Sequence, residues 1–154
     1  MTEPSNAEPP LPEPLMPEPP PLPLRLSPAT LLAIFVGGAL GTVSRFLLDT
    51  AHPTPSGQFP LTTLLINLTG SLAIGLLMPP LQRVAPRFPL LRPFLVVGIL
   101  GGWTTYSTLA VDTDLLFKGA HAGLALGYMA VTIVGGLALV LIGEAVSRKA
   151  APST

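Results

Sequence analysis

The sequence predicts an all-α membrane protein with four transmembrane helices. Of its 154 residues, 49% are apolar and only 10% are charged, whereas about 25% of the residues in a typical globular domain carry charge. The apolar residues gather in four long runs that are separated by short polar connections. The connections are too short to fold on their own, so we expect the function to lie within the bilayer.

The composition also excludes several classes of protein. The chain has no cysteine, which rules out a disulfide scaffold and any thiolate metal site. Its 8 basic and 8 acidic residues give a formal net charge of zero, whereas a nucleic-acid-binding protein normally carries a basic excess.

Residues 1–28 differ sharply from the rest of the chain, because they hold 11 of its 20 prolines. Glutamates recur every five residues there, at Glu3, Glu8, Glu13 and Glu18. Proline fixes φ and removes a backbone donor, so we expect a disordered, extended, polyproline-like tail on the aqueous side. The stretch lacks the basic start and apolar run of a secretory signal. The alternative reading is a docking peptide for a partner.

The four apolar runs each have the length of a membrane span. They are Ala29–Leu48, Leu61–Met78, Pro93–Val111 and Ala122–Gly143. Even the shortest would extend roughly 27 Å as a helix, close to the thickness of the hydrocarbon layer. None has the polar face of a surface helix in a soluble protein. We therefore predict a transmembrane domain over 29–147 and a short polar C-terminal tail over 148–154.

The distribution of basic residues predicts the orientation. Four spans put both termini and the loop after the second span on one side. That side holds six basic residues and the other side two; the six are Arg25, Arg83, Arg87, Arg92, Arg148 and Lys149. The positive-inside rule then places both termini in the cytoplasm, with the chain in the inner (plasma) membrane.

Small residues recur four apart within the runs, a spacing that lets helix backbones approach closely. The pairs are Gly37 with Gly41, Ser71 with Gly75, Gly98 with Gly102, and Gly123 with Gly127. We expect a tightly packed bundle with little interior, so that a pore would form between subunits.

The third run is unusual, because Gly101–Thr108 (GGWTTYST) places two glycines and four hydroxyl residues at its centre. Glycine destabilises a helix interior by about 1 kcal/mol, and hydroxyls compete for backbone hydrogen bonds. We expect a broken helix whose freed carbonyls can coordinate a small cation. The alternative is a continuous helix with its hydroxyls bonded to the preceding turn.

Two polar residues stand out in the first two runs. Asn67 lies at the centre of an otherwise apolar span, where its amide can either join helices or donate to an anion. Arg45 lies near the end of the first run and can either extend to the interface or attract anions to a vestibule. Asp112 and Asp114, near the end of the third run, are read as solvated.

Three motifs make the sequence similar to the Fluc (CrcB-like) fluoride channels. They are GGALGTVSR at Gly37–Arg45, LINLTGS at Leu65–Ser71 and GILGGWTTYST at Gly98–Thr108. The resemblance covers residues 30–147, with all four spans in the same order.

The resemblance implies an antiparallel, dual-topology homodimer with two pores at the interface, through which fluoride leaves the cytoplasm passively. It also implies a structural, untransported Na⁺ held by the backbone carbonyls of Gly101 and Thr104. Arg45 falls on the vestibule position. The remaining positions are expected to line the pore and bind fluoride: Asn67, Tyr106, Ser107, Thr108, Leu109, Tyr128 and Thr132.

Two of these positions depart from the family pattern, which has phenylalanine at both. Tyr106 keeps an aromatic ring with a positively polarised edge and adds a hydroxyl. Leu109 keeps only the bulk. The small polar donors suit fluoride, which is strongly hydrated and accepts hydrogen bonds readily.

Other functions remain as alternatives. A small multidrug-resistance transporter would need a carboxylate within the membrane, and the first, second and fourth runs contain none. A non-transporting assembly subunit would explain the glycines but not Asn67 or the hydroxyl residues. An enzyme is not expected, because both histidines lie in loops and no nucleophile–base pair is present. The charge bias leaves open a partner that is an oppositely inserted paralogous subunit instead of a second copy.

Overall fold

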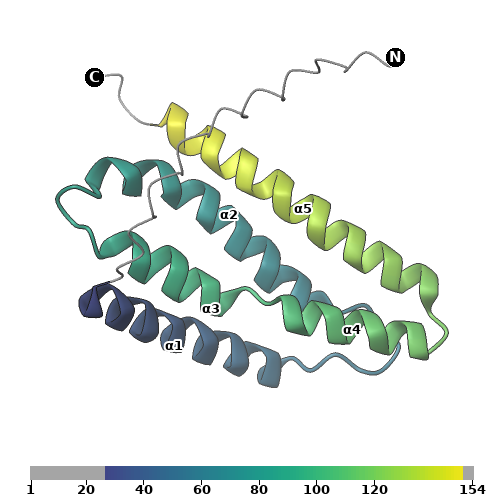
Figure 1. Cartoon of the computed structure of the whole chain (residues 1–154). Helices are drawn as coiled ribbons and strands as arrows, with labels where there is room; N and C mark the ends of the chain where they lie inside the picture. The colour runs from purple at the N-terminus through teal and green to yellow at the C-terminus, as the bar shows by residue number, and fades with distance from the viewer. Residues whose placement is uncertain (1–26, 151–154) are drawn as a thin grey trace, which may run out of the picture.

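A computed structural model of the chain describes residues 27–150, which are almost entirely helical (Figure 1). Within those residues no strand is present, and four helical segments are long and apolar enough to cross a membrane. The helices are α1 (Pro28–Ala51), α2 (Leu61–Val84), the π-helix η1 (Pro93–Leu100), α3 (Gly101–Trp103), α4 (Tyr106–Lys118) and α5 (Ala122–Lys149). The predicted all-α class with four membrane spans is confirmed.

All four spans are longer than the sequence predicted; α2 continues through Pro79 and Pro80 to Val84, and the third span continues to Lys118. Ser27 caps α1, because its hydroxyl accepts a hydrogen bond from the Thr30 amide at 3.1 Å. Pro28 is therefore the first helical residue, where its missing N–H is harmless; the rest of the predicted tail, 1–26, lies outside the described residues. Helix α5 continues to Lys149, since Glu144 and Arg148 form an i,i+4 pair at 2.6 Å across its last turns.

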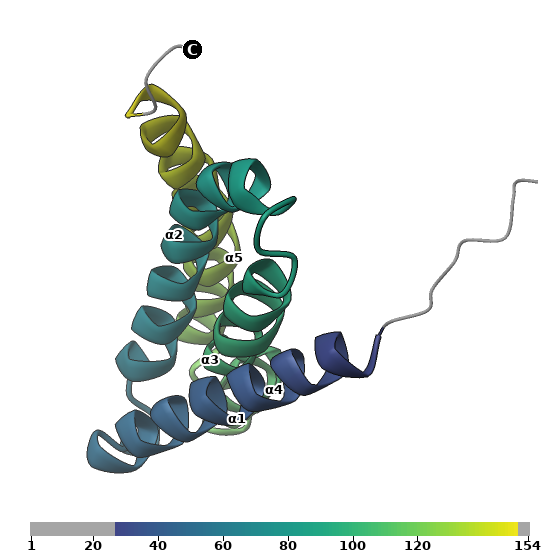
Figure 2. The ribbon, with the colours of Figure 1, turned by 90° about the vertical axis from the view of Figure 1, so that its left-hand side faces the viewer.

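The helices pack as two closely apposed pairs. Helix α2 lies chiefly against α5, and α1 lies chiefly against η1, crossing the other helices at a steep angle (Figure 2). Glycines make both approaches possible. A Cβ atom at Gly41 would overlap the Ile99 carbonyl oxygen, and one at Gly75 would overlap that of Val140.

The small-residue pairs of the first three spans therefore lie at helix contacts, as expected. The fourth pair behaves differently. Apart from chain neighbours and the backbone of the same helix, no heavy atom of the described chain lies within 4 Å of where a Cβ would stand on Gly123 or Gly127.

The π-helix η1 is the widest element of the bundle. Its hydrogen bonds join residues five apart instead of four, a rare geometry that is frequently found at functional sites. It begins at Pro93 and passes directly into the glycines that open α3.

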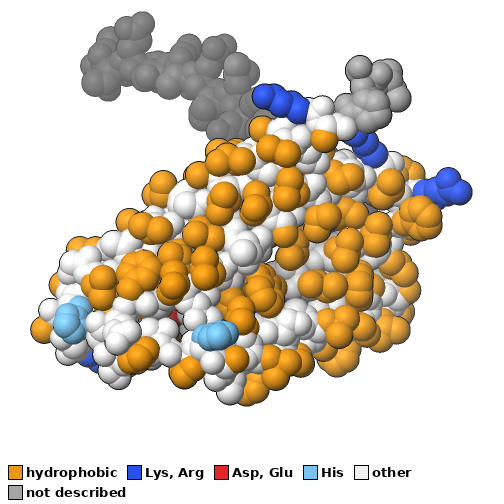
Figure 3. All heavy atoms as spheres, turned by 180° about the vertical axis from the view of Figure 1, so that it is seen from behind, with side chains coloured by type: hydrophobic (Ala, Val, Ile, Leu, Met, Phe, Trp, Pro, Cys, Tyr) orange, Lys and Arg blue, Asp and Glu red, His pale blue; other side chains and the backbone are white. Residues whose placement is uncertain are grey.

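The buried core is small and lies among α2, α4 and α5. It contains Leu64, Leu109, Leu116, Ala125 and Tyr128. The ring of Phe59 meets the ring of Tyr128 edge-on, with centroids 5.6 Å apart. On the face shown in Figure 3, apolar side chains predominate, most of the visible Lys and Arg side chains lie at one end, and the histidines lie toward the other.

Candidate functional site

The third span is interrupted between Trp103, where α3 ends, and Tyr106, where α4 begins. Thr104 (φ −72°, ψ 152°) and Thr105 (φ −143°, ψ 123°) both have extended backbone. An interruption of this kind releases backbone groups from the helical hydrogen-bond pattern at the depth where lipid offers no partner. Each released group must find another partner or remain unpaired.

Asn67 of α2 satisfies both backbone groups of Thr105. Its Oδ1 accepts a hydrogen bond from the Thr105 amide at 2.8 Å, and its Nδ2 donates to the Thr105 carbonyl at 3.0 Å. Only 9% of Asn67 is exposed. Joining two helices, one of the two roles considered for Asn67, is therefore observed. A primary amide has two N–H donors, so the second remains for another acceptor.

Close packing of α2 on the interruption supports this pairing. The Trp103 indole N–H donates to the Thr69 hydroxyl at 3.1 Å. A Cβ at Gly70 would overlap Cγ2 of Thr104 and would lie 3.1 Å from Cδ1 of Trp103. The glycine lets α2 approach the extended residues closely enough for Asn67 to reach them.

The carbonyl oxygens of Gly101, Trp103 and Thr104 are left without partners. Among residues 27–150, none of the three accepts a hydrogen bond; the Thr105 amide bonds to Asn67, the Thr104 amide to the Leu100 carbonyl at 3.0 Å, and the Thr108 amide to Thr105 Oγ1. Gly101 is exposed and Thr104 is half-buried. These are the two carbonyls that the resemblance assigns to Na⁺.

Arg45 of α1 donates a hydrogen bond to a carbonyl that lies between those of Gly101 and Thr104 in the sequence. Its Nε donates to the Gly102 carbonyl at 3.2 Å, and its guanidinium lies 3.7 Å from the carboxylate of Asp49. Only 22% of the Arg45 side chain is exposed. The guanidinium therefore lies beside the interruption instead of extending to the interface.

The hydroxyls that follow the interruption form a directed network. Thr105 Oγ1 accepts from the Thr108 amide at 3.1 Å, which caps α4, and its hydroxyl donates to Thr108 Oγ1 at 3.0 Å. Because that proton is used, the 3.1 Å bond between Thr105 and Ser107 has the Ser107 hydroxyl as donor. The Thr108 hydroxyl proton has no acceptor within the described chain.

Tyr106 projects from the first turn of α4 and is 81% exposed. It borders a groove of about 340 Å³ between α4 and α5, along with Leu109, Ala110, Thr113, Met129 and Ile133. Leu109 is 7% exposed and also belongs to the core, so its side chain closes the floor of the groove.

Tyr128 and Thr132 are buried within the helical bundle, apart from this groove. Tyr128 is 0% exposed, and its hydroxyl donates to Asp112 Oδ2 at 3.2 Å. The Thr132 hydroxyl donates to the Tyr128 carbonyl at 2.8 Å. Neither hydroxyl proton is therefore directed at the groove.

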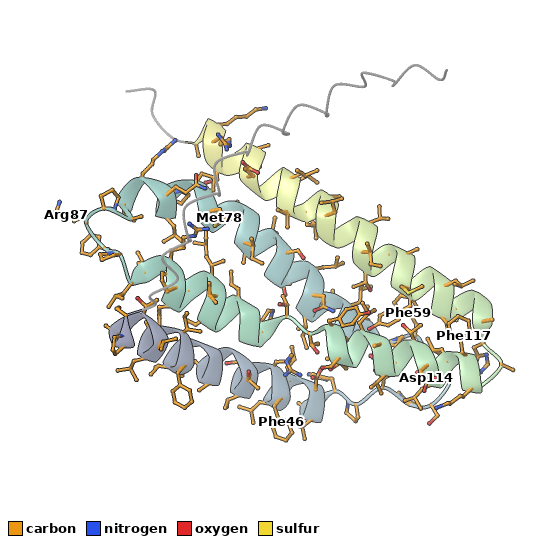
Figure 4. All side chains as sticks on the ribbon, in the orientation of Figure 1. Phe46, Phe59, Met78, Arg87, Asp114 and Phe117 are labelled. Carbon is orange, nitrogen blue, oxygen red and sulfur yellow. The ribbon has the colours of Figure 1, made fainter. Side chains whose placement is uncertain are left out.

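Asp112, which the sequence suggested was solvated, is half-buried and takes part in two hydrogen bonds between helices. Its Oδ2 accepts from the Thr63 hydroxyl at 2.9 Å as well as from Tyr128, so one carboxylate oxygen joins α2, α4 and α5. The helical spacing carried the signal: Asp112 follows the buried Leu109 by three residues and precedes the buried Leu116 by four. Asp114 faces outward (Figure 4) and pairs with Lys118 at 2.6 Å.

The structure thus brings together Arg45, Asn67 and the interrupted segment, and it sets Tyr128, Thr132 and Asp112 in a separate cluster. Over residues 27–150, no group of three or more His, Cys, Asp or Glu side chains could hold a metal ion. A cation at the interruption would therefore be bound by backbone and hydroxyl oxygens.

Comparison with known proteins identifies the family. The family model described as "CrcB-like protein, Camphor Resistance (CrcB)" matches residues 32–144. A "Fluoride-specific ion channel FluC 2" of Nocardia farcinica is 44% identical over 123 residues, which cover 80% of this chain and 88% of the relative. The "Fluoride-specific ion channel FluC" of Paracoccus denitrificans is 40% identical over 77% of this chain and 94% of the relative.

A longer relative, "Fluoride-specific ion channel FluC 3" of Streptomyces avermitilis, is 38% identical over 82% of this chain and 62% of its own length. These relatives are named as channels, which agrees with the expectation of a non-enzyme and disfavours a multidrug transporter. The extent of the matches, together with four membrane-length helical segments, shows that this multi-pass membrane chain belongs to the CrcB-like family.

Proposed function

We propose that the chain forms a fluoride-selective channel that lets fluoride leave the cytoplasm passively. The observation that carries the proposal is the extended Thr104–Thr105 segment held by Asn67, because it concentrates neutral N–H and O–H donors at mid-membrane. Neutral donors can replace the water of a small anion without trapping it, as a lysine or arginine at the centre would. The names of the relatives support the choice of fluoride.

We propose further that two antiparallel copies form the working unit, with two pores between them. The support is the pair of unpaired carbonyls, Gly101 and Thr104, at the surface of the subunit in the middle of the third span. A polar backbone atom facing hydrocarbon is strongly unfavourable, so protein has to cover this surface. A second copy in the opposite orientation would bring the same two carbonyls to the contact. An oppositely inserted paralogous subunit is the alternative partner.

The residues at this contact fit a structural Na⁺. Carbonyl oxygens of unwound helices are typical Na⁺ ligands, and Gly101 and Thr104 offer two such oxygens without a hydrogen-bond partner among residues 27–150. When bound, the ion would supply a fixed positive charge that lowers the free energy of an anion nearby, without itself being transported. The chain's own part is to hold the two carbonyls in place through Asn67 and Gly70.

The pore would then be lined by the groups that the subunit leaves available. Asn67 offers its second N–H, Thr108 its hydroxyl proton, and Tyr106 the positively polarised edge of an exposed ring. Ser107 and Leu109 belong to the same wall. Arg45 would give the vestibule a positive potential.

Tyr128 and Thr132 are proposed as the second part of the pathway. In the single subunit their hydroxyls are bonded to Asp112 and to the helix backbone. They would donate hydrogen bonds to a fluoride ion once the ion competes with these acceptors for the hydroxyl protons. We place the channel in the plasma membrane; of two antiparallel copies, one would have its arginine-rich end in the cytoplasm and the other would have it outside.

An efflux experiment tests the function. The full chain is reconstituted in vesicles loaded with potassium fluoride or potassium chloride, valinomycin is added, and released anion is followed with an ion-selective electrode. We expect rapid fluoride release and negligible chloride release. Equal release of both anions, or no release from vesicles shown to contain the protein, would overturn the proposal.

A further inference from the structure

The end of the bundle where α1 begins carries a concentration of positive charge. Five basic residues lie there in the described chain: Arg83, Arg87, Arg92, Arg148 and Lys149. The one acidic residue at this end, Glu144, is paired with Arg148. Across residues 27–150, no carboxylate lies within 4.0 Å of Arg83, Arg87 or Arg92. The other half of the bundle, from the interruption onward, has two basic and three acidic residues in the described chain: Arg45, Lys118, Asp49, Asp112 and Asp114.

A mostly apolar groove opens beside these arginines. It has a volume of about 480 Å³, and its lining includes Ala33, Arg87, Phe88, Leu90, Leu91 and Phe94. The Arg87 guanidinium carbon lies 5.8 Å from the centroid of the Phe88 ring. In Figure 4, Arg87 stands at the tip of the loop between α2 and η1, away from the bundle. The groove therefore combines aromatic walls with a cationic rim.

The chain itself supplies a segment with complementary chemistry. Residues 1–26 contain ten prolines and four glutamates, against one arginine. Aromatic-lined grooves are the usual receptors for proline-rich segments, and carboxylates pair with arginine. The segment joins the bundle at Ser27, and Ala33, within the first two turns of α1, already lines the groove. Covalent attachment so close to the groove gives the segment a high effective concentration there.

We propose that the N-terminal segment, residues 1–26, docks in this groove, with its prolines against Phe88 and Phe94 and its glutamates facing Arg83, Arg87 and Arg92. An anionic lipid headgroup could also meet the arginines. The tethered segment is favoured because it matches both the aromatic walls and the charge.

Disulfide trapping tests the docking. Because the native chain has no cysteine, any cross-link must form between introduced cysteines. Leu11→Cys in the segment is combined with Leu91→Cys in the groove, in the full chain, in vesicles that contain anionic phosphatidylglycerol. The matched control pairs Leu11→Cys with Gln82→Cys, an exposed position on α2 near the same end and outside the groove. We expect the Leu91 pair to cross-link at least about tenfold faster than the Gln82 pair.

Two further measurements probe the charge. Replacing the four glutamates by glutamine leaves the membrane bundle untouched, and we expect it to slow the Leu91 cross-link several-fold; 1 M salt should have the same effect. Equal rates at Leu91 and Gln82, or a rate that is insensitive to both charge and salt, would overturn the proposal. Cross-linking in neutral phosphatidylcholine vesicles but not in anionic vesicles would also overturn it, because lipid headgroups would then hold the groove.

Discussion

The side-chain amide of Asn67 pairs with the backbone of Thr105 through two hydrogen bonds, at 2.8 and 3.0 Å. The amide takes the place of the backbone partners that Thr105 would have in a continuous helix. A residue on one helix thus fixes the conformation of another, at the position where three carbonyls stay open and hydroxyl donors begin. In the proposed channel, Asn67 has a structural role and a conducting role together.

Replacing Asn67 by Asp should impair both the structural role and the conducting role. The carboxylate can still accept from the Thr105 amide but cannot donate to the Thr105 carbonyl, and its charge repels an anion. We expect fluoride efflux to fall by at least about 100-fold and the free energy of unfolding to fall by about 1–3 kcal/mol. Thr62→Ser, on the same helix and near its end, is the control and should keep both near wild type. Wild-type flux in Asn67→Asp would contradict a pore role.

The contact between Gly70 and Thr104 gives a test with a built-in rescue. Gly70→Ala would force its Cβ onto Cγ2 of Thr104, so we expect a lower melting temperature and reduced flux. Thr104→Ser removes that methyl and keeps the hydroxyl that donates to the Leu100 carbonyl at 2.9 Å. The double variant should therefore recover most of the loss, as measured by thermal unfolding in detergent. Gly38→Ala, whose Cβ would meet nothing closer than 4.0 Å, should be neutral.

Leu109→Phe tests whether the family's missing aromatic ring can be restored. Leu109 is packed in the core beside Tyr128, and overpacking of this kind typically destabilises by about 1–3 kcal/mol. We expect a less stable protein without increased flux, whereas Leu109→Met should be tolerated. A more active, equally stable Leu109→Phe channel would show that the position has room for a ring.

The hydroxyls of Thr63 and Tyr128 share Asp112 Oδ2 as acceptor, so their removal should not be additive. Tyr128→Phe keeps the ring against Phe59 and leaves Thr63 as a donor, and we expect a loss of about 1–2 kcal/mol. Thr63→Val should behave similarly. The double variant leaves the carboxylate oxygen without either donor and should exceed the sum of the two single losses. Simple additivity in denaturant unfolding would mean that the carboxylate is hydrated instead.

Sodium should stabilise the protein in a concentration-dependent way, because a ligand that binds only the folded state raises its stability. We expect the melting temperature to rise with NaCl and to rise less with KCl or N-methyl-D-glucamine chloride at equal ionic strength. Identical curves for the three salts would argue against a Na⁺ site at Gly101 and Thr104.

The sequence predicted the spans because a bilayer-length apolar run has one solution, a transmembrane helix. The residues around the extended Thr104–Thr105 segment could also be found, since their glycines and hydroxyls are unfavourable in lipid. The pairing of Asn67 with Thr105 could not be predicted, because it depends on how closely Gly70 lets α2 approach. Nor could the burial of Tyr128, which depends on the rotation of α5 about its own axis. The true end of α5 was missed because the polar residues from 148 onward were read as a tail, although Arg148 forms a helical pair with Glu144.

The π-helix η1 makes the third span tolerant of a kind of genetic change that α-helical spans resist. Each hydrogen bond of η1 spans one residue more than an α-helical hydrogen bond. Deleting a single codon within Pro93–Leu100 would let the segment tighten into ordinary α geometry, which takes up the lost residue and leaves the helix beyond it close to its present orientation. In an α-helix the same deletion would rotate everything beyond it by roughly 100° about the axis. The third span would still insert, and Thr105 would still face Asn67. Over evolutionary time, single-residue deletions should therefore be retained more readily in these eight residues than within α1, α2 or α5.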